Sequence, residues 1–118
     1  MRALALSLAA AFAVIAASTA LAAPAATKLT GTVGPGFTIT LKGPTGKVVK
    51  TLRQGAYTLT VNDKADIHDF HISGPALNKK TSVSGTGTTT WKIVLKKGKY
   101  HYQCDPHASL MNGNVTVA

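Results

Sequence analysis

The sequence contains no glutamate, and its only acidic side chains are four aspartates, set against 13 lysines and arginines. The formal net charge of +9 favours solubility and attracts the chain to acidic surfaces. The positive residues are scattered along the chain and are not massed in one run. We therefore interpret them as a solvated basic surface, expect no binding to nucleic acid, and keep an acidic protein partner open.

Cysteine is almost absent as well, because Cys104 is the only one in the chain. A single cysteine cannot form an internal disulfide, and small secreted domains that depend on disulfides carry even numbers of cysteines. A lone exposed thiol is a liability in an oxidising compartment. Cys104 therefore needs a reason to be there, such as burial, catalysis or metal binding.

Long hydrophobic runs are absent beyond the first two dozen residues. The chain opens with Met1 and Arg2, continues through the almost unbroken apolar residues 3–17, and reaches a small-x-small pattern at Ala20-Leu21-Ala22. This order is typical of a secretory signal peptide and its cleavage site.

We predict from this pattern a signal peptide over residues 1–22 and one small mature domain over residues 23–118. A retained membrane anchor is the alternative, because the apolar run extends to Ala23. Pro24, directly after the small residues, favours cleavage. We expect a monomer that is periplasmic or secreted and has no stable membrane insertion once the leader is removed.

Helical periodicity of useful length is also missing, and short alternating segments separated by turn residues take its place. We expect strands over residues 28–33, 37–41, 47–52, 57–61, 67–73, 89–95, 99–104 and 114–117, and a loop or edge strand over residues 78–85. Seven or eight short strands of this kind indicate an all-β fold, an antiparallel Greek-key β-sandwich. The predicted core contains Phe37, Ile39, Leu41, Tyr57, Leu59, Val61, Trp91, Ile93 and Leu95.

The most informative stretch lies near the C-terminus and contains Cys104, His107 and Met111. A thiolate, an imidazole and a thioether are the soft ligands that copper takes, and two histidines, one cysteine and a distant axial methionine form the blue-copper arrangement. The second histidine has two candidates, His68 and His71. Three positions apart in a strand, they face opposite sides, so only one of them can point into the site.

Two other kinds of site use cysteine and histidine. A Cys-His nucleophilic pair needs a base within reach, an orienting group and a substrate cleft, and nothing in the sequence resembles a protease signature or an oxyanion hole. A structural zinc site takes cysteine and histidine without a thioether, so Met111 argues against zinc.

The segment Tyr102-Gln103-Cys104-Asp105-Pro106-His107, with Met111 and Gly113-Asn114-Val115-Thr116-Val117 after it, resembles the C-terminal copper loop of plastocyanins, pseudoazurins and amicyanins. The segment His68-Asp69-Phe70-His71 resembles the one that supplies the first histidine in these proteins. The resemblance implies a cupredoxin fold and one type 1 copper ion. It also implies His68, Cys104, His107 and Met111 as the copper ligands.

Three details depart from that family pattern. Asp69 stands where the family has an asparagine that ties the two ligand segments together, and an ionised carboxylate accepts but cannot donate hydrogen bonds. Three residues separate His107 from Met111, whereas plastocyanins have four and amicyanins two. Pro106 has no amide hydrogen to offer the thiolate, which shifts the potential.

The resemblance further implies one-electron transfer between redox partners outside the cytoplasm, and no enzymatic activity. By the family's geometry, partners, for which an acidic surface is one option, would dock around His107. An apolar patch of Pro35, Gly36, Pro75, Ala108 and Leu110 is expected there. The alternatives are a copper scavenger or chaperone that uses the same ligands, and a copper-free binding module of the same fold.

Overall fold

The computed structural model of the protein describes residues 9–20 and 25–118. The basic start and the cleavage position after Ala22 lie outside the described residues, so the predicted signal peptide stays a prediction. Among the residues that are described, no helix has the length and apolar character needed to cross a membrane.

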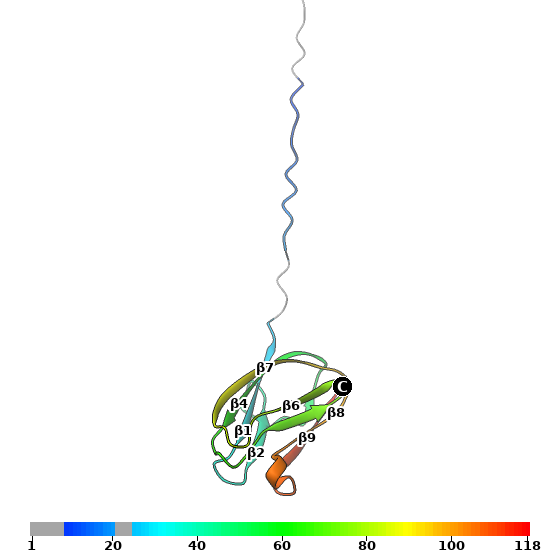
Figure 1. The fold of residues 1–118 in the computed structure, drawn as a ribbon. Coiled ribbons are helices and arrows are strands. Elements are labelled where there is room, and N and C mark those ends of the chain that lie inside the picture. The colour runs from blue at the N-terminus through cyan, green and yellow to red at the C-terminus, as the bar shows by residue number, and fades with distance from the viewer. Residues whose placement is uncertain (1–8, 21–24) are drawn as a thin grey trace, which may run out of the picture.

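Two β-sheets packed against each other account for the described domain (Figure 1). The first sheet has the order β2-β1-β4-β7 and contains β1 (Thr27–Val33), β2 (Ile39–Lys42), β4 (Gly55–Asp63) and β7 (Gly87–Leu95). The second sheet has the order β3-β9-β8-β5-β6 and contains β3 (Thr51–Leu52), β5 (His71–Gly74), β6 (Leu77–Lys80), β8 (Gly98–Gln103) and β9 (Asn112–Val117). Within the described residues the helical content is one short 3-10 turn, η1 (Asp105–His107).

The predicted all-β sandwich is confirmed, but both sheets are mixed, and the described residues form nine strands. β1 pairs with β4 in parallel, and β3 pairs with β9 in parallel. These two pairs are the exceptions to the expected antiparallel pairing. The reason is that the chain leaves the first sheet after β2, forms β3 in the second sheet, and returns beside β1 in the same direction.

Two predicted strands are shorter than expected. The segment 47–52 keeps only β3 and an isolated bridge at Val48. The segment 67–73 becomes a strand only from His71, so His68 lies in the loop between β4 and β5 and not in a strand. The predicted edge strand within residues 78–85 is present as β6.

The core lies between the two sheets and follows the alternation of the long strands. Along β4, every second side chain from Tyr57 to Asp63 is buried, as expected for a strand with one face inward. The predicted core residues Leu41, Tyr57, Leu59, Val61, Ile93 and Leu95 are buried, and Ile39 and Trp91 are partly buried against them. Phe37 is the exception, because it precedes β2 and is 57% exposed.

Two tyrosines of β8 fill the space under the second sheet because glycines make room for them. A Cβ added to Gly74 would collide with the Tyr100 ring, and one added to Gly113 would collide with the Tyr102 ring. The Tyr102 ring stacks on Phe70 with 5.7 Å between centroids and 10° between planes. The strand that leads to Cys104 is thereby fixed on both of its flanks.

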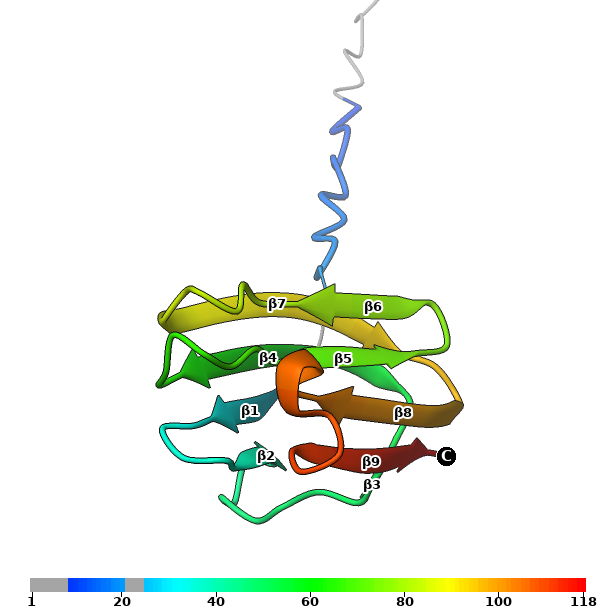
Figure 2. The same cartoon turned by 60° about the horizontal axis from the view of Figure 1, so that its bottom comes forward.

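The strand directions define two ends of the sandwich (Figure 2). β1, β4 and β8 all run toward one end, which we call the site end, where Asp63 pairs with Gly87 and Gln103 pairs with Asn112. At the opposite end Gly55 pairs with Leu95 and Gly98 pairs with Val117. β1 begins at the opposite end, so the chain enters the domain there.

Replacing Tyr100 by phenylalanine is expected to destabilise the domain more than the same change at Tyr57. The Tyr100 hydroxyl accepts from the Lys96 amide at 2.9 Å and lies within donor distance of the carbonyls of Lys96 and Pro75, at 2.9 and 3.1 Å. The Tyr57 hydroxyl donates one bond, to the Arg53 carbonyl at 2.6 Å.

Urea unfolding should therefore show a loss of about 2 kcal/mol for Tyr100→Phe and about 1 kcal/mol for Tyr57→Phe, because buried polar groups left without partners carry a desolvation cost. Equal losses of unfolding free energy for the two variants would contradict the larger contribution assigned to the hydrogen bonds of the Tyr100 hydroxyl.

Candidate metal centre

A tight loop between β8 and β9 brings three candidate ligands together. Cys104 directly follows β8, His107 ends η1, and Met111 directly precedes β9. The Cys104 amide donates to the Met111 carbonyl at 3.0 Å, and the Met111 amide donates to the His107 carbonyl at 2.9 Å. These backbone bonds close the loop on itself and fix where the side chains emerge.

His68 reaches the same place from the loop between β4 and β5, and it is completely buried. Its imidazole lies against Gly34, where an added Cβ would come within 3.0 Å of the His68 Cδ2 atom. Gly34 also has a φ of +72°, which favours glycine. The turn after β1 therefore permits the close approach of this histidine.

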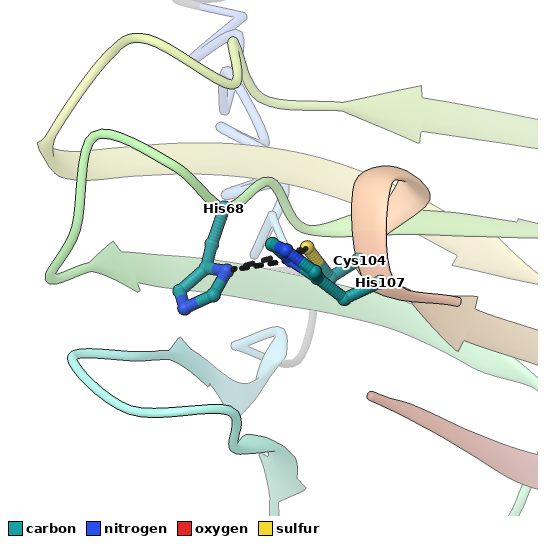
Figure 3. A group of neighbouring side chains, drawn as sticks. All are labelled: His68, Cys104 and His107. Carbon is teal, nitrogen blue, oxygen red and sulfur yellow. Dashed lines mark hydrogen bonds between the residues drawn. The ribbon is translucent and has the colours of Figure 1, made fainter. Parts of the chain in front are cut away.

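The three donor atoms form a small triangle (Figure 3). The Nδ1 atoms of His68 and His107 are 3.1 Å apart, and the Cys104 Sγ atom is 3.6 and 3.5 Å from them. A metal about 2.0 Å from each nitrogen and about 2.3 Å from the sulfur fits such a triangle. The predicted residues His68, Cys104 and His107 are thus brought together, and Met111 is buried beside them in the loop, 1% exposed.

The two nitrogens of His68 differ in their surroundings. Nδ1 faces the triangle, whereas Nε2 is buried without a hydrogen-bond partner among the described residues. A histidine that binds a metal through one nitrogen keeps its proton on the other. The donor chemistry and the direction of Nδ1 therefore fit a metal ligand.

The burial of Cys104 argues against a nucleophilic role. Burial raises the pKa of the Cys104 thiol, although hydrogen bonds from the backbone N–H groups of Asp69 and His107 oppose this shift. A catalytic cysteine needs a lowered pKa and access to substrate, and Cys104 is 0% exposed. A bound cation is what would stabilise the thiolate in this place.

The aspartate at position 69 still ties the two ligand segments together. The Asp69 side chain accepts a hydrogen bond from the Asp105 amide at 2.6 Å. Burial raises the pKa of Asp69, and the nearby charge of Asp105 acts in the same direction. Because this bond needs only an acceptor, aspartate serves here where the family pattern has asparagine.

His71 is not part of the triangle and instead anchors the loop from outside. Its Nδ1 donates to the Asp105 carboxylate at 2.8 and 3.0 Å, and its Nε2 donates to the Asn78 side-chain oxygen at 2.6 Å. Burial disfavours the charged imidazole, but the bonds to Asp105 and Asn78 outweigh it and raise the pKa of His71. Burial likewise opposes the charge of Asp105, yet the bonds from Gln103 and His71 lower its pKa.

An exposed aromatic ring at the site was missed by the sequence analysis. The Phe37 ring packs edge to face against the His107 ring, with 4.9 Å between the ring centroids, and its centroid is 5.5 Å from that of the His68 ring. The alternation of residues 37–41 predicted a core position for Phe37. The Pro35-Gly36 turn directly before it was the available signal, because a residue at a turn need not follow the strand's alternation.

The predicted apolar patch is only partly at the site. Leu110 is 70% exposed on the ligand loop, and Pro35 and Gly36 are exposed in the turn after β1. Pro75 was wrongly included, since it follows β5 at the opposite end, where its carbonyl contacts the Tyr100 hydroxyl. Ile67, 50% exposed beside His68, was not foreseen.

The profile of copper binding proteins, plastocyanin/azurin family, matches residues 58–118, just over half of the chain. The chain belongs to this family. The matched region includes both ligand segments of the cupredoxin, His68 as well as Cys104 to Met111. The family's cofactor is copper, which agrees with the chemistry of the donor triangle.

Solved structures share the cupredoxin fold at low sequence identity. Reduced rusticyanin superposes with a TM-score of 0.56 and 22% identity, over 77% of this chain and 78% of its own. A methionine-to-alanine variant of amicyanin with Cu(I) superposes with a TM-score of 0.51 and 18% sequence identity, over 77% of this chain and 82% of the amicyanin chain. A chain of a heme-copper terminal oxidase dimer superposes with a TM-score of 0.53 and 20% sequence identity, over 77% of this chain and 63% of the oxidase chain. A comparison with curated proteins finds no match.

The pair of His71 and Asp105 is expected to make stability depend on pH in one direction. The folded pKa of His71 lies above its ordinary value of 6.5, so its contribution is complete below that value and is lost as pH rises through the folded pKa. The pKa of Asp105 is lowered, so the carboxylate stays charged across this window.

The measurement is urea unfolding of the copper-free domain between about pH 5 and about pH 9, for the parent and His71→Gln. The parent should be more stable by up to about 1 kcal/mol at the acid end, and the difference should vanish at the alkaline end. His101→Gln is the control, because the contacts of His101 are the amide oxygens of Asn114 and Gln103. A constant difference across the range would contradict the ion pair.

Proposed function

We propose that this cupredoxin is an exported electron carrier that holds one type 1 copper ion through His68, Cys104, His107 and Met111. The observation that carries the proposal is the triangle of two Nδ1 atoms and one Sγ atom with sides of 3.1, 3.5 and 3.6 Å. Bound there, copper supplies a one-electron couple between Cu(I) and Cu(II). The leader-like residues 1–22 support export to the periplasm or the medium.

The surroundings of the ligands favour retention of geometry during electron transfer. Cys104 and Met111 are joined by a backbone hydrogen bond, and the Asp69–Asp105 bond fixes the two ligand segments to each other. Burial of His68, Cys104 and Met111 keeps water away. Ligands held this firmly change position little when the charge of a bound ion changes, which lowers the cost of gaining or losing an electron.

The same burial disfavours copper delivery. A carrier that gives up its metal needs ligands that can open to a recipient, and of the four proposed ligands only His107 is partly exposed. We therefore favour electron transfer over the scavenger or chaperone function.

Electrons would enter and leave beside His107, through an apolar surface that we call the docking patch. The docking patch consists of Phe37, Ile67 and Leu110, which are 57%, 50% and 70% exposed. The contact between the Phe37 ring and the His107 ring extends the ligand toward the surface. Apolar surfaces of this kind support brief encounters with redox partners.

The charge of the partner stays a prediction. All four aspartates of the chain lie at or near the site end, at positions 63, 66, 69 and 105. Their negative charge lies toward the same end as the docking patch, which makes this end less attractive to an acidic partner. We propose that apolar contact governs docking.

Copper loading tests the ligand assignment. The mature domain with Cu(II) should develop an intense visible absorption, which Cys104→Ala should abolish because the thiolate is the source of the colour. Met111→Leu should retain copper and colour but change the reduction potential, since the weak axial ligand tunes it.

Optical and spin-resonance spectra with a redox titration provide the measurement. Reversible one-electron cycling without loss of metal supports the carrier. Binding mainly of Cu(I) with ready release would favour copper delivery, and no binding at all would leave a copper-free module.

Electron self-exchange between two copies tests the docking patch without knowledge of the partner. Leu110→Glu should slow self-exchange by about tenfold, because a carboxylate must then be desolvated in the encounter. Val94→Glu is the matched control, since Val94 is 61% exposed on β7 toward the opposite end. Nuclear magnetic resonance line broadening in mixtures of reduced and oxidised domain gives the rate, and equal slowing by both variants would reject the docking patch.

A further inference from the structure

The charges of this domain are separated along its long direction. All four aspartates lie at or near the site end, whereas many of the cations gather at the opposite end. The basic pole, as we call this second group, consists of the exposed residues Lys28, Arg53, Lys92, Lys96, Lys97 and Lys99. The described chain places no carboxylate side chain at this pole, although the terminal carboxylate of Ala118 lies there, with its amide bonded to the Leu52 carbonyl.

The basic pole also carries an exposed apolar spot. At the end of β7 the outward positions are Lys92 and Val94, and Lys96 directly follows the strand; Val94 is 61% exposed between the two lysines. Ala56 is the neighbour of Val94 across the strand pair, and it too is exposed. An apolar spot between cations suits the boundary of a lipid bilayer, where lysine heads meet phosphates and small apolar side chains enter the interface.

The path of the chain points to the same surface. β1 starts at the end of the basic pole, so the chain enters the domain on this side. η1 lies at the other end (Figure 1), and Phe37 of the docking patch contacts His107 of η1 there. A domain seated on a membrane by its basic pole would therefore turn its metal centre toward the surrounding solution.

We propose that the basic pole is a docking surface for anionic phospholipid headgroups, and that it orients the domain with its docking patch facing away from the bilayer. Each lysine near an anionic leaflet strengthens binding about fivefold, and the attraction falls with salt. The contribution is electrostatic and peripheral, so it differs from insertion of a membrane-spanning segment.

The test uses the copper-loaded domain 23–118, because all described strands and the buried core lie within residues 27–118. The domain is mixed with vesicles of phosphatidylcholine alone or with phosphatidylglycerol, at low and high sodium chloride, and the bound fraction is measured by sedimentation. We expect binding only to the vesicles with phosphatidylglycerol, and release by salt.

Two triple variants with the same loss of charge separate the pole from net charge. The pole variant is Lys92→Gln with Lys96→Gln and Lys97→Gln. The control is Lys64→Gln with Lys79→Gln and Lys80→Gln, because the exposed Lys64 directly follows β4 at the site end and the exposed Lys79 and Lys80 lie on β6. The pole variant should lose on the order of 100-fold in vesicle affinity, and the control less than about tenfold. Equal losses, or no binding of the parent domain to phosphatidylglycerol, would overturn the proposal.

Two further measurements complete the test. Binding to soluble polyaspartate without binding to anionic vesicles would overturn the lipid assignment in favour of an acidic protein surface. The rate of copper reduction by ascorbate should be the same in solution and on vesicles, because the docking patch faces away, and strong protection on vesicles would contradict the orientation. Sedimentation does not depend on the redox function, so failure here leaves the electron-carrier proposal standing.

Discussion

The loop between β8 and β9 is the constraint on which the rest of the structure depends. Its ends are fixed by strand pairing, and the hydrogen bond from Cys104 to Met111 draws the two ends of the ligand segment together. Within so short a closed loop, the thiol and the imidazole of His107 have little choice of direction. The sandwich beneath it, with Tyr102 stacked on Phe70, serves as the rigid base.

Much of the fold was predictable because strand alternation is a local property. The long strands β4 and β7 follow apolar and polar periodicity, and their predicted core residues are buried or partly buried. The parallel pairing of β1 with β4 was not predictable, because periodicity tells which face is buried but not which strand lies beside which. The bounds of the short strand β3 could not be predicted either, because two residues are too few to show an alternating pattern.

The residues of the site likewise divide into those that local sequence predicts and those that depend on the assembled fold. Cys104, His107 and Met111 are close in sequence, and residue type alone indicated a soft metal. His68 needed the family resemblance to be separated from His71, and the structure shows that His71 pairs with Asp105 across 34 positions. The place of Phe37 over both imidazoles depends on where the turn after β1 leaves the sheet, and this is a property of the assembled sandwich.

The order of the ligands along the chain has a consequence for assembly. Three of the four lie between residues 104 and 111, after eight of the nine described strands, while His68 comes from the middle of the chain. A nascent or truncated polypeptide that stops before Cys104 offers at most one of these side chains, that of His68. The complete set of donors is therefore available only late in synthesis, so a molecule that holds copper through all four has been made at least as far as Met111.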